Sequence, residues 1–349
     1  GSGNGGVHVT GSATLINNTI SNNGGPGIQA TGAITLTGNT ITNNNGYALT
    51  MNAAAVRDSL LAGNTISGNL HDAIGINGAS YSGGWGGSVL NGDHVWPDWL
   101  TDFEVDIFWD LVVGEGGSLT LPAGLTLRFR GNYTPGYLGS AFYVLVGGQL
   151  IAQGSAASPI TFTVNNDPPA TIWAGFNAAQ GSTVLLDHVT LEYGYDNQIN
   201  GDATTVTHST IRYNQTGLTV TDSGASIHYN NIYGNSGYGL YNTSASADID
   251  ARYNWWGSNS GPAPYGSGNG INYATCWDPV GLVYHICDYY VDVDPWLGKE
   301  VSTGAQLGNS GPLSSVQAII NDPVNTANGN YAHQHTDIAI PTRGLALDF

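Results

Sequence analysis

Three histidines recur every 20 residues in the second half of the chain, where imidazoles at a fixed spacing could bind a metal ion. They are His188, His208 and His228. Histidine nitrogen is a usual zinc ligand, and stacked imidazoles would be one way to build such a site. Counted back from the nearest core aliphatic residue, however, the three stand one, three and four positions before it. We therefore expect them in three different columns and predict no three-histidine site.

Two further groups of candidate metal ligands lie toward the C-terminus. The first is His333, His335 and Asp337, and the second is Asp288, Asp292 and Asp294. The histidines alternate along one strand face, and the aspartates would offer the oxygen ligands that calcium prefers. Because the acidic spacing matches no dedicated calcium loop, we predict no metal and no cofactor, with calcium at the acidic group as the alternative.

Enzymes that cleave polysaccharides need convergent charged groups: a basic side chain beside calcium-binding carboxylates, or two carboxylates for the acid and base roles. The sequence is poor in both. The nearest basic pair is Arg128 with Arg130, and the nearest aspartate pair is Asp248 with Asp250, beside Arg252. The second group is typical of a solvated strand face. We therefore predict no catalytic residues and no enzyme activity.

The whole chain carries few charges, and most of them are negative. Only 9% of its 349 residues are charged, with 7 basic residues against 25 acidic ones, which gives a formal net charge of −18. Such a field disfavours nucleic acid as a partner and would repel polyanions such as uronates at low salt, while attracting divalent cations. The 51 glycines and the many Asn, Ser and Thr residues disfavour helices and suit short strands with tight corners.

The chain has two cysteines, Cys276 and Cys287, eleven positions apart and without histidine at metal spacing. We predict one disulfide between them, formed in an oxidising compartment, with two buried free thiols as the alternative. No apolar run reaches the roughly 18 residues of a membrane-spanning helix, so we expect no membrane span. The first residues already resemble the middle of a repeat, so we expect a mature or excised piece of a longer secreted protein.

The candidate residues named above must be positioned by the strands of a repeat, whose sequence pattern is N-x-I-x-x-N. It begins at residues 18, 39 and 64 and returns in related form at 209, 230 and 254, with spacings of 21 to 25 residues. A small residue and an aliphatic one follow the copies, as in Gly27-Ile28 and Gly217-Leu218. Each period therefore holds two or three short strands with turns between them.

Coils of this length cannot bury an apolar face alone, so neighbouring coils must stack, each strand pairing in parallel with the next at about 4.8 Å. We expect an internal column of isoleucines and a corner column of asparagines, where Asn tolerates left-handed geometry and its amide bonds to the coils above and below. The two ladders are Ile20, Ile41, Ile66, Ile211 and Ile232, and Asn18, Asn39, Asn64, Asn230 and Asn254. A leucine-rich repeat has a similar period, but these coils carry too few aliphatic residues for one.

These coils resemble the right-handed parallel β-helix repeats of the pectate-lyase-like superfamily over about residues 7–80 and 100–260. The resemblance implies an all-β, right-handed β-solenoid but no activity. Runs around residues 144–163 resemble the opening coils of secreted bacterial β-helices, so we expect a second unit that starts near residue 100, with Arg128 in an opening coil. The predicted parts are a first unit (1–80), a Gly/Trp-rich connector (81–99), a second unit (100–260), a capping region (261–300) and an extended tail (301–349).

Two later segments resemble parts of secreted bacterial proteins. The Asn-Trp-Trp-Gly run from residue 254, with Asp-Pro-Trp-Leu from 294, resembles a common ending of such β-helices. We expect Trp255, Trp256 and Trp296 to cap the apolar column, with a sugar-binding aromatic platform as the alternative. The stretch from residue 322 to 349 resembles the segment that leads into the tyrosine-aspartate repeats of RHS/YD-repeat proteins, which implies an extracellular setting and no activity.

These features predict a secreted, cell-surface protein with a structural or adhesive role. The end of a β-helix exposes unpaired strands, so we expect copies of the chain to stack end to end as a filament, or the chain to belong to a giant surface protein. The alternative is a glycan-binding or polysaccharide-degrading β-helix, with a groove drawn from Trp173, Tyr193, Tyr195 and Tyr213.

Overall fold

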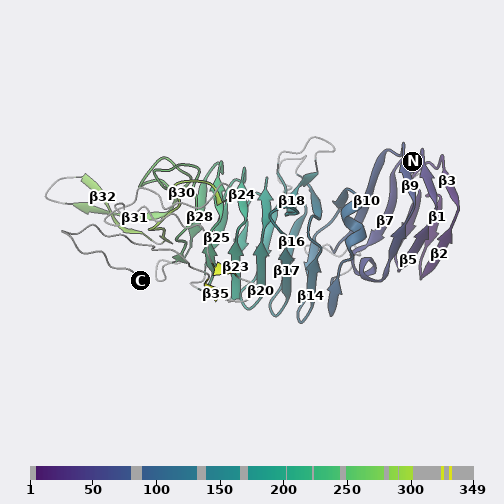
Figure 1. The fold of residues 1–349 in the computed structure, drawn as a ribbon, viewed down its shortest axis with the longest axis horizontal. Coiled ribbons are helices and arrows are strands. Elements are labelled where there is room, and N and C mark those ends of the chain that lie inside the picture. The colour runs from purple at the N-terminus through teal and green to yellow at the C-terminus, as the bar shows by residue number, and fades with distance from the viewer. Residues whose placement is uncertain are drawn as a thin grey trace.

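The structure is a computed structural model that describes most of the first 301 residues. The described ranges are 5–79, 89–131, 139–165, 172–201, 203–221, 224–243, 249–278, 283–289, 291–301, 324–325 and 330–331, of which the side chains in 273–278, 283–289, 324–325 and 330–331 are not described. In this part the chain winds into an elongated stack of short strands, with the first coils at one end and the coils near residue 250 at the other (Figure 1).

Three long parallel sheets run along the stack. The ten-stranded sheet consists of β1 (Val7–Val9), β4 (Ile28–Ala30), β7 (Tyr47–Asn52), β10 (His71–Asn77), β12 (Val105–Ile107), β15 (Thr126–Arg130), β18 (Ile160–Asn165), β21 (Val189–Glu192), β24 (Thr210–Arg212) and β27 (Asn231–Tyr233). The six-stranded sheet consists of β11 (Asp93–Val95), β14 (Ser118–Leu121), β17 (Gln149–Gln153), β20 (Thr183–Asp187), β23 (Ala203–Thr207) and β26 (Ser226–His228). The seven-stranded sheet consists of β13 (Leu111–Val113), β16 (Ala141–Val144), β19 (Gly175–Ala178), β22 (Gln198–Ile199), β25 (Leu218–Val220), β28 (Tyr238–Asn242) and β30 (Gly270–Ile271).

Shorter sheets complete the two ends. The first coils hold two three-stranded parallel sheets, one of β2 (Ala13–Ile16), β5 (Ile34–Thr37) and β8 (Leu60–Ala62), the other of β3 (Thr19–Ser21), β6 (Thr40–Thr42) and β9 (Thr65–Ser67). Toward the C-terminus, β29 (Ile249–Asp250) pairs with β33 (Val291–Asp292), β31 (Tyr273–Asp278) with β32 (Val283–Tyr289), and β34 (Val324–Asn325) with β35 (Asn330–Tyr331). The predicted all-β solenoid of parallel coils is confirmed.

Helical structure is scarce in the described ranges. It consists of two short 3-10 turns, η1 (Ala53–Asp58) and η2 (Asp98–Asp102). Neither these nor any other described segment is a helix with the length and apolar character needed to cross a bilayer.

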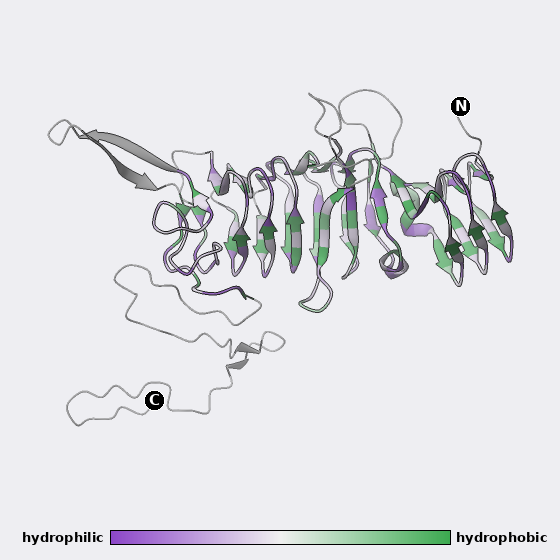
Figure 2. Cartoon of the chain, turned by 90° about the horizontal axis from the view of Figure 1, so that it is seen from above, coloured by the Kyte–Doolittle hydropathy of each residue, from purple (hydrophilic) through white to green (hydrophobic). Residues whose placement is uncertain are grey.

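The core is a continuous apolar column inside the coils. Strands alternate inward and outward residues, as in β15, where Leu127 and Phe129 are fully buried between half-exposed neighbours. Of the predicted isoleucine ladder, Ile20, Ile41, Ile211 and Ile232 are buried, and Ile66 is partly buried against the core. Aliphatic residues fill the first coils and aromatic ones the middle, where Phe129 stacks on Trp173 at 4.3 Å. Hydrophobic positions recur in this way from coil to coil along the stack (Figure 2).

The ten-stranded sheet runs through both predicted units without a break. β10 pairs with β12, with Ile74 opposite Val105, so the coils on either side of the predicted connector stack directly. The repeat changes its phase at this junction. In the first unit the motif strands are β3, β6 and β9, outside the ten-stranded sheet, whereas in the second unit the motif strands β24 and β27 belong to it. The motif is therefore carried by a different face of the stack in each unit.

Left-handed residues form the corners on both sides of each motif strand. Asn17 (φ 56°) and Asn22 (φ 57°) bound β3, and His208 (φ 48°) and Tyr213 (φ 56°) bound β24. We expected the ladder asparagines themselves to adopt this geometry, and that was wrong: each of them comes directly after the left-handed residue, as Asn18 follows Asn17. The turn is made one residue earlier, which leaves the ladder asparagine free to turn its amide along the stack.

The ladder asparagines hydrogen-bond from coil to coil. The backbone N–H of Asn18 donates to Oδ1 of Asn39 at 2.9 Å, and that of Asn39 donates to Oδ1 of Asn64 at 2.9 Å. Asn230 and Asn254 repeat this bond at 2.8 Å in the second unit. Buried backbone groups at the corners would otherwise lack partners, so these amides stabilise the stacking of coils.

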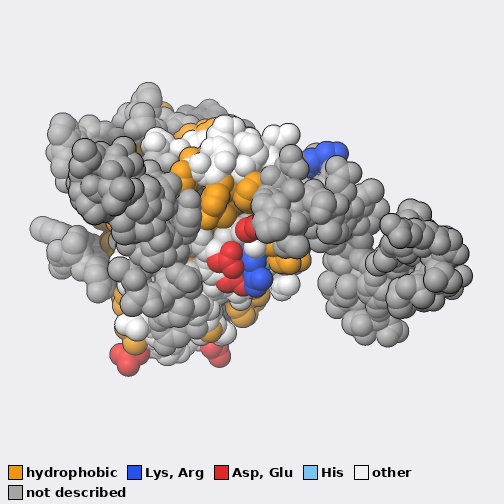
Figure 3. Space-filling view, turned by 90° about the vertical axis from the view of Figure 1, so that its left-hand side faces the viewer, with side chains coloured by type: hydrophobic (Ala, Val, Ile, Leu, Met, Phe, Trp, Pro, Cys, Tyr) orange, Lys and Arg blue, Asp and Glu red, His pale blue; other side chains and the backbone are white. Residues whose placement is uncertain are grey.

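The predicted cap residues lie at the far end of the second unit. Trp256 is fully buried, Trp296 is nearly so, and Trp255 is half-buried. The indole N–H of Trp296 donates to the carbonyl oxygen of Asn259 at 3.3 Å, and its ring lies against Gly261, where a Cβ atom would come within 2.5 Å of it. Figure 3 looks onto this end, where acidic and basic side chains lie side by side among hydrophobic ones.

The two cysteines lie on the paired antiparallel strands β31 and β32, and Cys276 stands opposite His285 in the backbone register. Their side chains fall outside the described part of the structure, so the disulfide stays a prediction. The same holds for His333, His335, Asp337 and most of the tail that resembles RHS proteins, which lie outside the described residues.

Candidate functional site

The expectation that the three histidines occupy separate columns is wrong for two of them. β21 and β24 pair with Leu191 opposite Ile211, so His188 and His208 both stand three residues before the paired aliphatic side chain. Their rings stack with centroids 5.0 Å apart and an interplanar angle of 20°. Val189 is also buried, and counting back from it instead of from Leu191 hid the match.

His228 does lie in a different column. It ends β26 opposite Thr207, which in turn lies opposite Asp187. Its Nδ1 is 2.9 Å from the carbonyl oxygen of Arg252. The described part of the chain therefore holds a pair of stacked histidines and not a ladder of three.

Beside this pair, a groove of about 440 Å³ opens on the outer face of the ten-stranded sheet. Thr190, Thr210 and Asn231 lie along its floor, directly opposite one another on β21, β24 and β27. They point outward because they alternate with buried neighbours such as Leu191 and Ile211. Three successive strands each contribute to the groove, so it runs along the stack as far as β27, where Glu300 and Val301 also line it and the backbone N–H of Val301 donates to Oδ1 of Asn231 at 2.9 Å.

Charged and aromatic side chains flank one side of the floor. Glu192, Arg212 and Tyr233 form the next outward column on the same three strands. Arg212 Nε donates to Glu192 Oε2 at 2.8 Å, and its guanidinium carbon lies 5.3 Å from the centre of the Tyr213 ring. Partial burial lowers the pKa of Arg212, but hydrogen bonds with Tyr233 and Glu192 outweigh it and hold the pKa above its usual value. This column therefore offers a fixed cation whose charge Glu192 balances.

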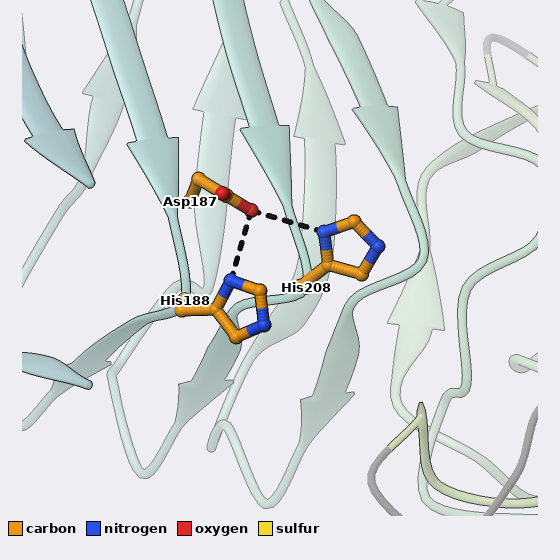
Figure 4. Close-up of side chains that lie close together, drawn as sticks. All are labelled: Asp187, His188 and His208. Carbon is orange, nitrogen blue, oxygen red and sulfur yellow. Dashed lines mark hydrogen bonds and ion pairs between the residues drawn. The ribbon is translucent and has the colours of Figure 1, made fainter. Parts of the chain in front are cut away.

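The stacked histidines flank the other side, next to Asp187 at the end of β20 (Figure 4). Asp187 Oδ1 is 2.9 Å from Nδ1 of His208 and 3.2 Å from Nδ1 of His188, and it accepts a 3.1 Å hydrogen bond from the Thr207 hydroxyl. Partial burial raises the pKa of Asp187, but the bond with His208, the charge of His188 and the bond with Thr207 together bring it below its usual value. Asp187 is therefore an anion at neutral pH.

The corners beside the groove carry bulky residues in left-handed geometry: His188 (φ 52°), Tyr193 (φ 58°), His208 (φ 48°) and Tyr213 (φ 56°). Corners of the first unit hold Asn or Gly instead, as at Asn17. Left-handed backbone costs a bulky residue about 1–2 kcal/mol, and such strained positions cluster at functional sites. Tyr193 and Tyr213 stack at 5.8 Å. The second unit therefore has histidine and tyrosine at the corners beside the groove, although asparagine or glycine would adopt this backbone geometry with less strain.

A second polar cluster lies on the same sheet, in a hollow of about 320 Å³. Arg128 Nε donates to Asp106 Oδ1 at 2.6 Å, and its Nη1 pairs with Glu104 Oε2 at 2.6 Å. Burial lowers the pKa of Arg128, but the neighbouring Asp106 and Glu104 outweigh it and raise the pKa above its usual value. We expected Arg128 in an opening coil, and that was wrong: β15 is the sixth strand of the ten-stranded sheet, because the first unit stacks directly before β12. Because two carboxylates bind this guanidinium, Arg128 suits a structural role more than that of a catalytic base.

The remaining predicted groups are dispersed. Arg252 pairs with Asp250 at 2.7 Å and lies 3.8 Å from Asp292, which favours the predicted solvated strand face, while Asp248 lies outside the described residues. The side chain of Asp288 is also not described, so calcium at the acidic group stays a hypothesis.

Of the aromatic residues suggested for a glycan groove, two stack their rings in the described part of the chain. Tyr193 and Tyr213 stack near the groove, as described above. Trp173 is fully buried, and its indole N–H donates to the carbonyl oxygen of Glu192 at 2.8 Å. Tyr195 lines a separate hollow of about 230 Å³ together with Tyr143.

Sequence reasoning missed the groove itself. Its floor and flanks are the outward residues of aligned motif strands, such as Thr190 with Thr210 and Glu192 with Arg212. An alignment of Leu191 with Ile211 would have placed opposite charges in one column and both histidines in another. The sequence signal was therefore the alignment of Leu191, and not of Val189 two residues earlier, with Ile211.

Comparison with known proteins agrees with the architecture. The family model for a right handed beta helix region matches residues 1–84 and 147–255, which is more than half of the chain. A search of curated proteins and a search of solved structures each gave no match. The matched stretches contain the motif coils of both units, including the strands that form the groove. The chain therefore belongs to the family of proteins with a right-handed β-helix region.

Proposed function

We propose that this β-helix is an extracellular adhesive protein that binds a glycan chain in the groove over β21, β24 and β27. The observation that carries the proposal is the groove itself. Its volume of about 440 Å³ falls within the range of about 300–1,000 Å³ that is usual for ligand sites. Because three successive strands each place an outward polar residue on the floor, at one strand spacing from the next, the groove suits an extended ligand with many polar groups.

The groove lining suits a ligand rich in hydroxyl groups. The hydroxyls of Thr190 and Thr210 can each donate and accept, as can the phenol of Tyr233, while Arg212 donates. Such donors and acceptors are the partners that sugar hydroxyl groups need.

Charge favours a neutral glycan over an anionic one. The formal net charge of −18 repels polyanions at low salt. The cation within the groove, Arg212, is already balanced by Glu192 at 2.8 Å. A uronate chain would have to compete with Glu192 for this guanidinium, whereas neutral hydroxyls need only share it.

Two carboxylates near the groove, Asp187 and Glu192, favour binding without cleavage. A glycosidase acid has a raised pKa, so that it carries a proton at neutral pH. The pKa of Asp187 is shifted the other way, as described above. Glu192 accepts hydrogen bonds from Arg212 at 2.8 Å and from Thr163 at 3.0 Å, which engages both of its oxygens.

Calorimetric titration with neutral oligosaccharides of glucan, mannan and xylan type, and with oligogalacturonate for comparison, tests the proposal. We expect a neutral oligosaccharide to bind. Arg212→Ala should weaken binding about tenfold or more, since a hydrogen bond to a charged group is worth about 1.5–3 kcal/mol. Thr210→Val, which keeps the side-chain shape, should also weaken it. Arg57→Ala is the matched control, because Arg57 is exposed on η1 and does not line the groove.

Two outcomes would contradict the proposal. One is that none of the oligosaccharides binds, and the other is that Arg57→Ala weakens binding as much as Arg212→Ala. A reducing-end assay on the same mixtures checks the second half of the proposal. New reducing ends that disappear in Asp187→Asn would make the protein an enzyme.

A stiff stack of coils also suits an adhesive protein that holds its binding face away from a surface. The end-to-end homopolymer that the sequence suggests accompanies this role as a further proposal. Electron microscopy of native material tests it: uniform filaments with an axial repeat of one chain would support self-assembly, and dispersed monomers would contradict it.

A further inference from the structure

We propose that Asp187, His188 and His208 form a binding site for a divalent transition-metal ion, with zinc as the probe. The three side chains gather where the end of β20 meets the corners before β21 and β24. The two histidines also line the groove, but the proposal does not depend on glycan binding.

The distances between the donor atoms fit a shared metal ion. One donor atom from each residue lies within 4.8 Å of the other two. Asp187 Oδ1 is 2.9 Å from Nδ1 of His208 and 3.2 Å from Nδ1 of His188. Two ligands of one tetrahedral zinc ion, each about 2.0–2.1 Å from the metal, lie roughly 3.3 Å apart. Figure 4 shows one nitrogen of each imidazole turned toward Asp187. The carboxylate oxygen is therefore about as far from each of these nitrogens as two ligands of one zinc ion are from each other.

One of these donor atoms lacks a partner. Nδ1 of His188 is buried, and it makes no hydrogen bond within the described ranges, because its contact with Asp187 does not have hydrogen-bond geometry. A buried polar atom without a partner costs about 1–3 kcal/mol. Coordination of a metal ion would give this buried nitrogen a partner, with release of any proton that it carries.

The backbone holds the donors in place. His188 and His208 occupy equivalent corners of adjacent coils in left-handed geometry, with φ 52° and 48°. Their stacked rings are 5.0 Å apart, and the backbone N–H of His188 donates to the carbonyl oxygen of Thr207 at 3.2 Å. A site assembled from two hydrogen-bonded coils needs little reorganisation to bind an ion.

The donor types select the class of metal. Imidazole nitrogen suits zinc, copper and nickel, whereas calcium prefers an all-oxygen set of six to eight ligands. Three protein ligands leave a coordination position for water or for a ligand in the groove. The formal net charge of −18 also raises the local concentration of cations near the surface.

Calorimetric titration of the metal-stripped protein with Zn²⁺ at neutral pH tests the proposal, and visible absorption after addition of Co²⁺ reports nitrogen coordination directly. We expect one ion per chain. His208→Ala and Asp187→Asn should each weaken zinc binding by roughly tenfold to a hundredfold, which is the range seen even for indirect supports of a site. Ca²⁺ should not compete.

His228→Ala is the matched control, because His228 recurs in the same repeat but lies in a different column, with its Nδ1 2.9 Å from the carbonyl oxygen of Arg252. It should bind zinc like the unaltered protein. Zinc should also raise the Tm of the unaltered protein and of His228→Ala, but not of His208→Ala. Absence of zinc binding at millimolar ion, or equal losses in His228→Ala and His208→Ala, would overturn the site.

Discussion

The phenolic hydroxyl of Tyr47 donates a 2.8 Å hydrogen bond to Oδ2 of Asp106, 59 residues further along the chain. Tyr47 belongs to β7 in the first unit and Asp106 to β12 in the second, so this bond crosses the junction between them. Asp106 is only 1% exposed, and its other oxygen accepts from Arg128 at 2.6 Å. The junction therefore contains a buried carboxylate that depends on donors from both sides.

Tyr47→Phe should lower the free energy of unfolding by about 1–3 kcal/mol, because it removes a donor from a buried charge. Equilibrium unfolding in urea measures the change. Tyr238→Phe is the control, since Tyr238 is 41% exposed and loses only a solvated hydroxyl. Equal midpoints for Tyr47→Phe and the unaltered protein would contradict this role for the bond.

The same tyrosine gives a prediction at high pH. Burial, the charge of Asp106 and their hydrogen bond raise the pKa of Tyr47 well above its usual value near 10. Its stabilising contribution is therefore complete below pH about 10 and is lost as the pH rises beyond it, because only the unfolded chain ionises readily. The difference in Tm between the unaltered protein and Tyr47→Phe should shrink above pH about 10. A constant difference up to pH 11.5 would count against it.

Asp187 gives the opposite dependence, at low pH. Its pKa is lowered in the folded protein, so its contribution to stability is present above the usual aspartate pKa of about 3.9 and is lost as the pH falls through and below that value. Asp187→Asn should therefore be less stable than the unaltered protein at pH 7, and the gap should narrow below pH about 4. Thermal unfolding in EDTA between pH 3 and 7 measures it. The exposed Asp102→Asn should show no such gap.

Asn230→Ala tests the asparagine ladder. The Asn230 amide accepts from the backbone N–H of Ser209 at 2.9 Å and donates to the carbonyl oxygen of Val206 at 2.7 Å. Both bonds are buried, so their loss should cost about 2–4 kcal/mol. Asn18→Ala is the control, because Asn18 is exposed and should cost under about 1 kcal/mol. Urea unfolding compares the two, and similar losses would show that the buried ladder has no special role.

Gly234→Ala and Gly63→Ala separate backbone strain from ring contact. Both glycines are left-handed, with φ 67° and 62°. A Cβ at Gly63 would meet nothing within 4 Å, whereas one at Gly234 would lie 2.9 Å from the Tyr213 ring. Gly63→Ala should cost about 1–2 kcal/mol, and Gly234→Ala at least about 1 kcal/mol more. If the two variants unfold at the same denaturant concentration, Tyr213 moves aside freely and does not fix this edge of the groove.

The repeat motif was sufficient to predict the fold, because Ile41 or Ile232 can be buried only if neighbouring coils stack. The groove was not predictable in the same way. The groove depends on which outward residues of neighbouring coils share a column. If Val189 instead of Leu191 is aligned with Ile211, every other residue of that coil is placed two positions out of register. Two stacked or adjoining units were expected, but the strands that join them were not predicted, because the pairing of β10 with β12 brings together segments that share no motif.

The change of phase at the junction limits how far any ligand can extend. In the first unit the ten-stranded sheet is built from strands that follow the motif, so the Thr190 column does not continue there: the exposed Gln29 stands opposite Thr50, which is buried. Threonines continue the Thr190 column onto β18 and β15, where Thr161 stands opposite Thr190 and Thr126 stands opposite Thr161. Four strand spacings of about 4.8 Å separate β15 from β27, so the matched column is about 19 Å long. Tight adhesion would therefore come from many molecules acting together, each holding a short stretch of ligand, and not from one molecule holding a long one.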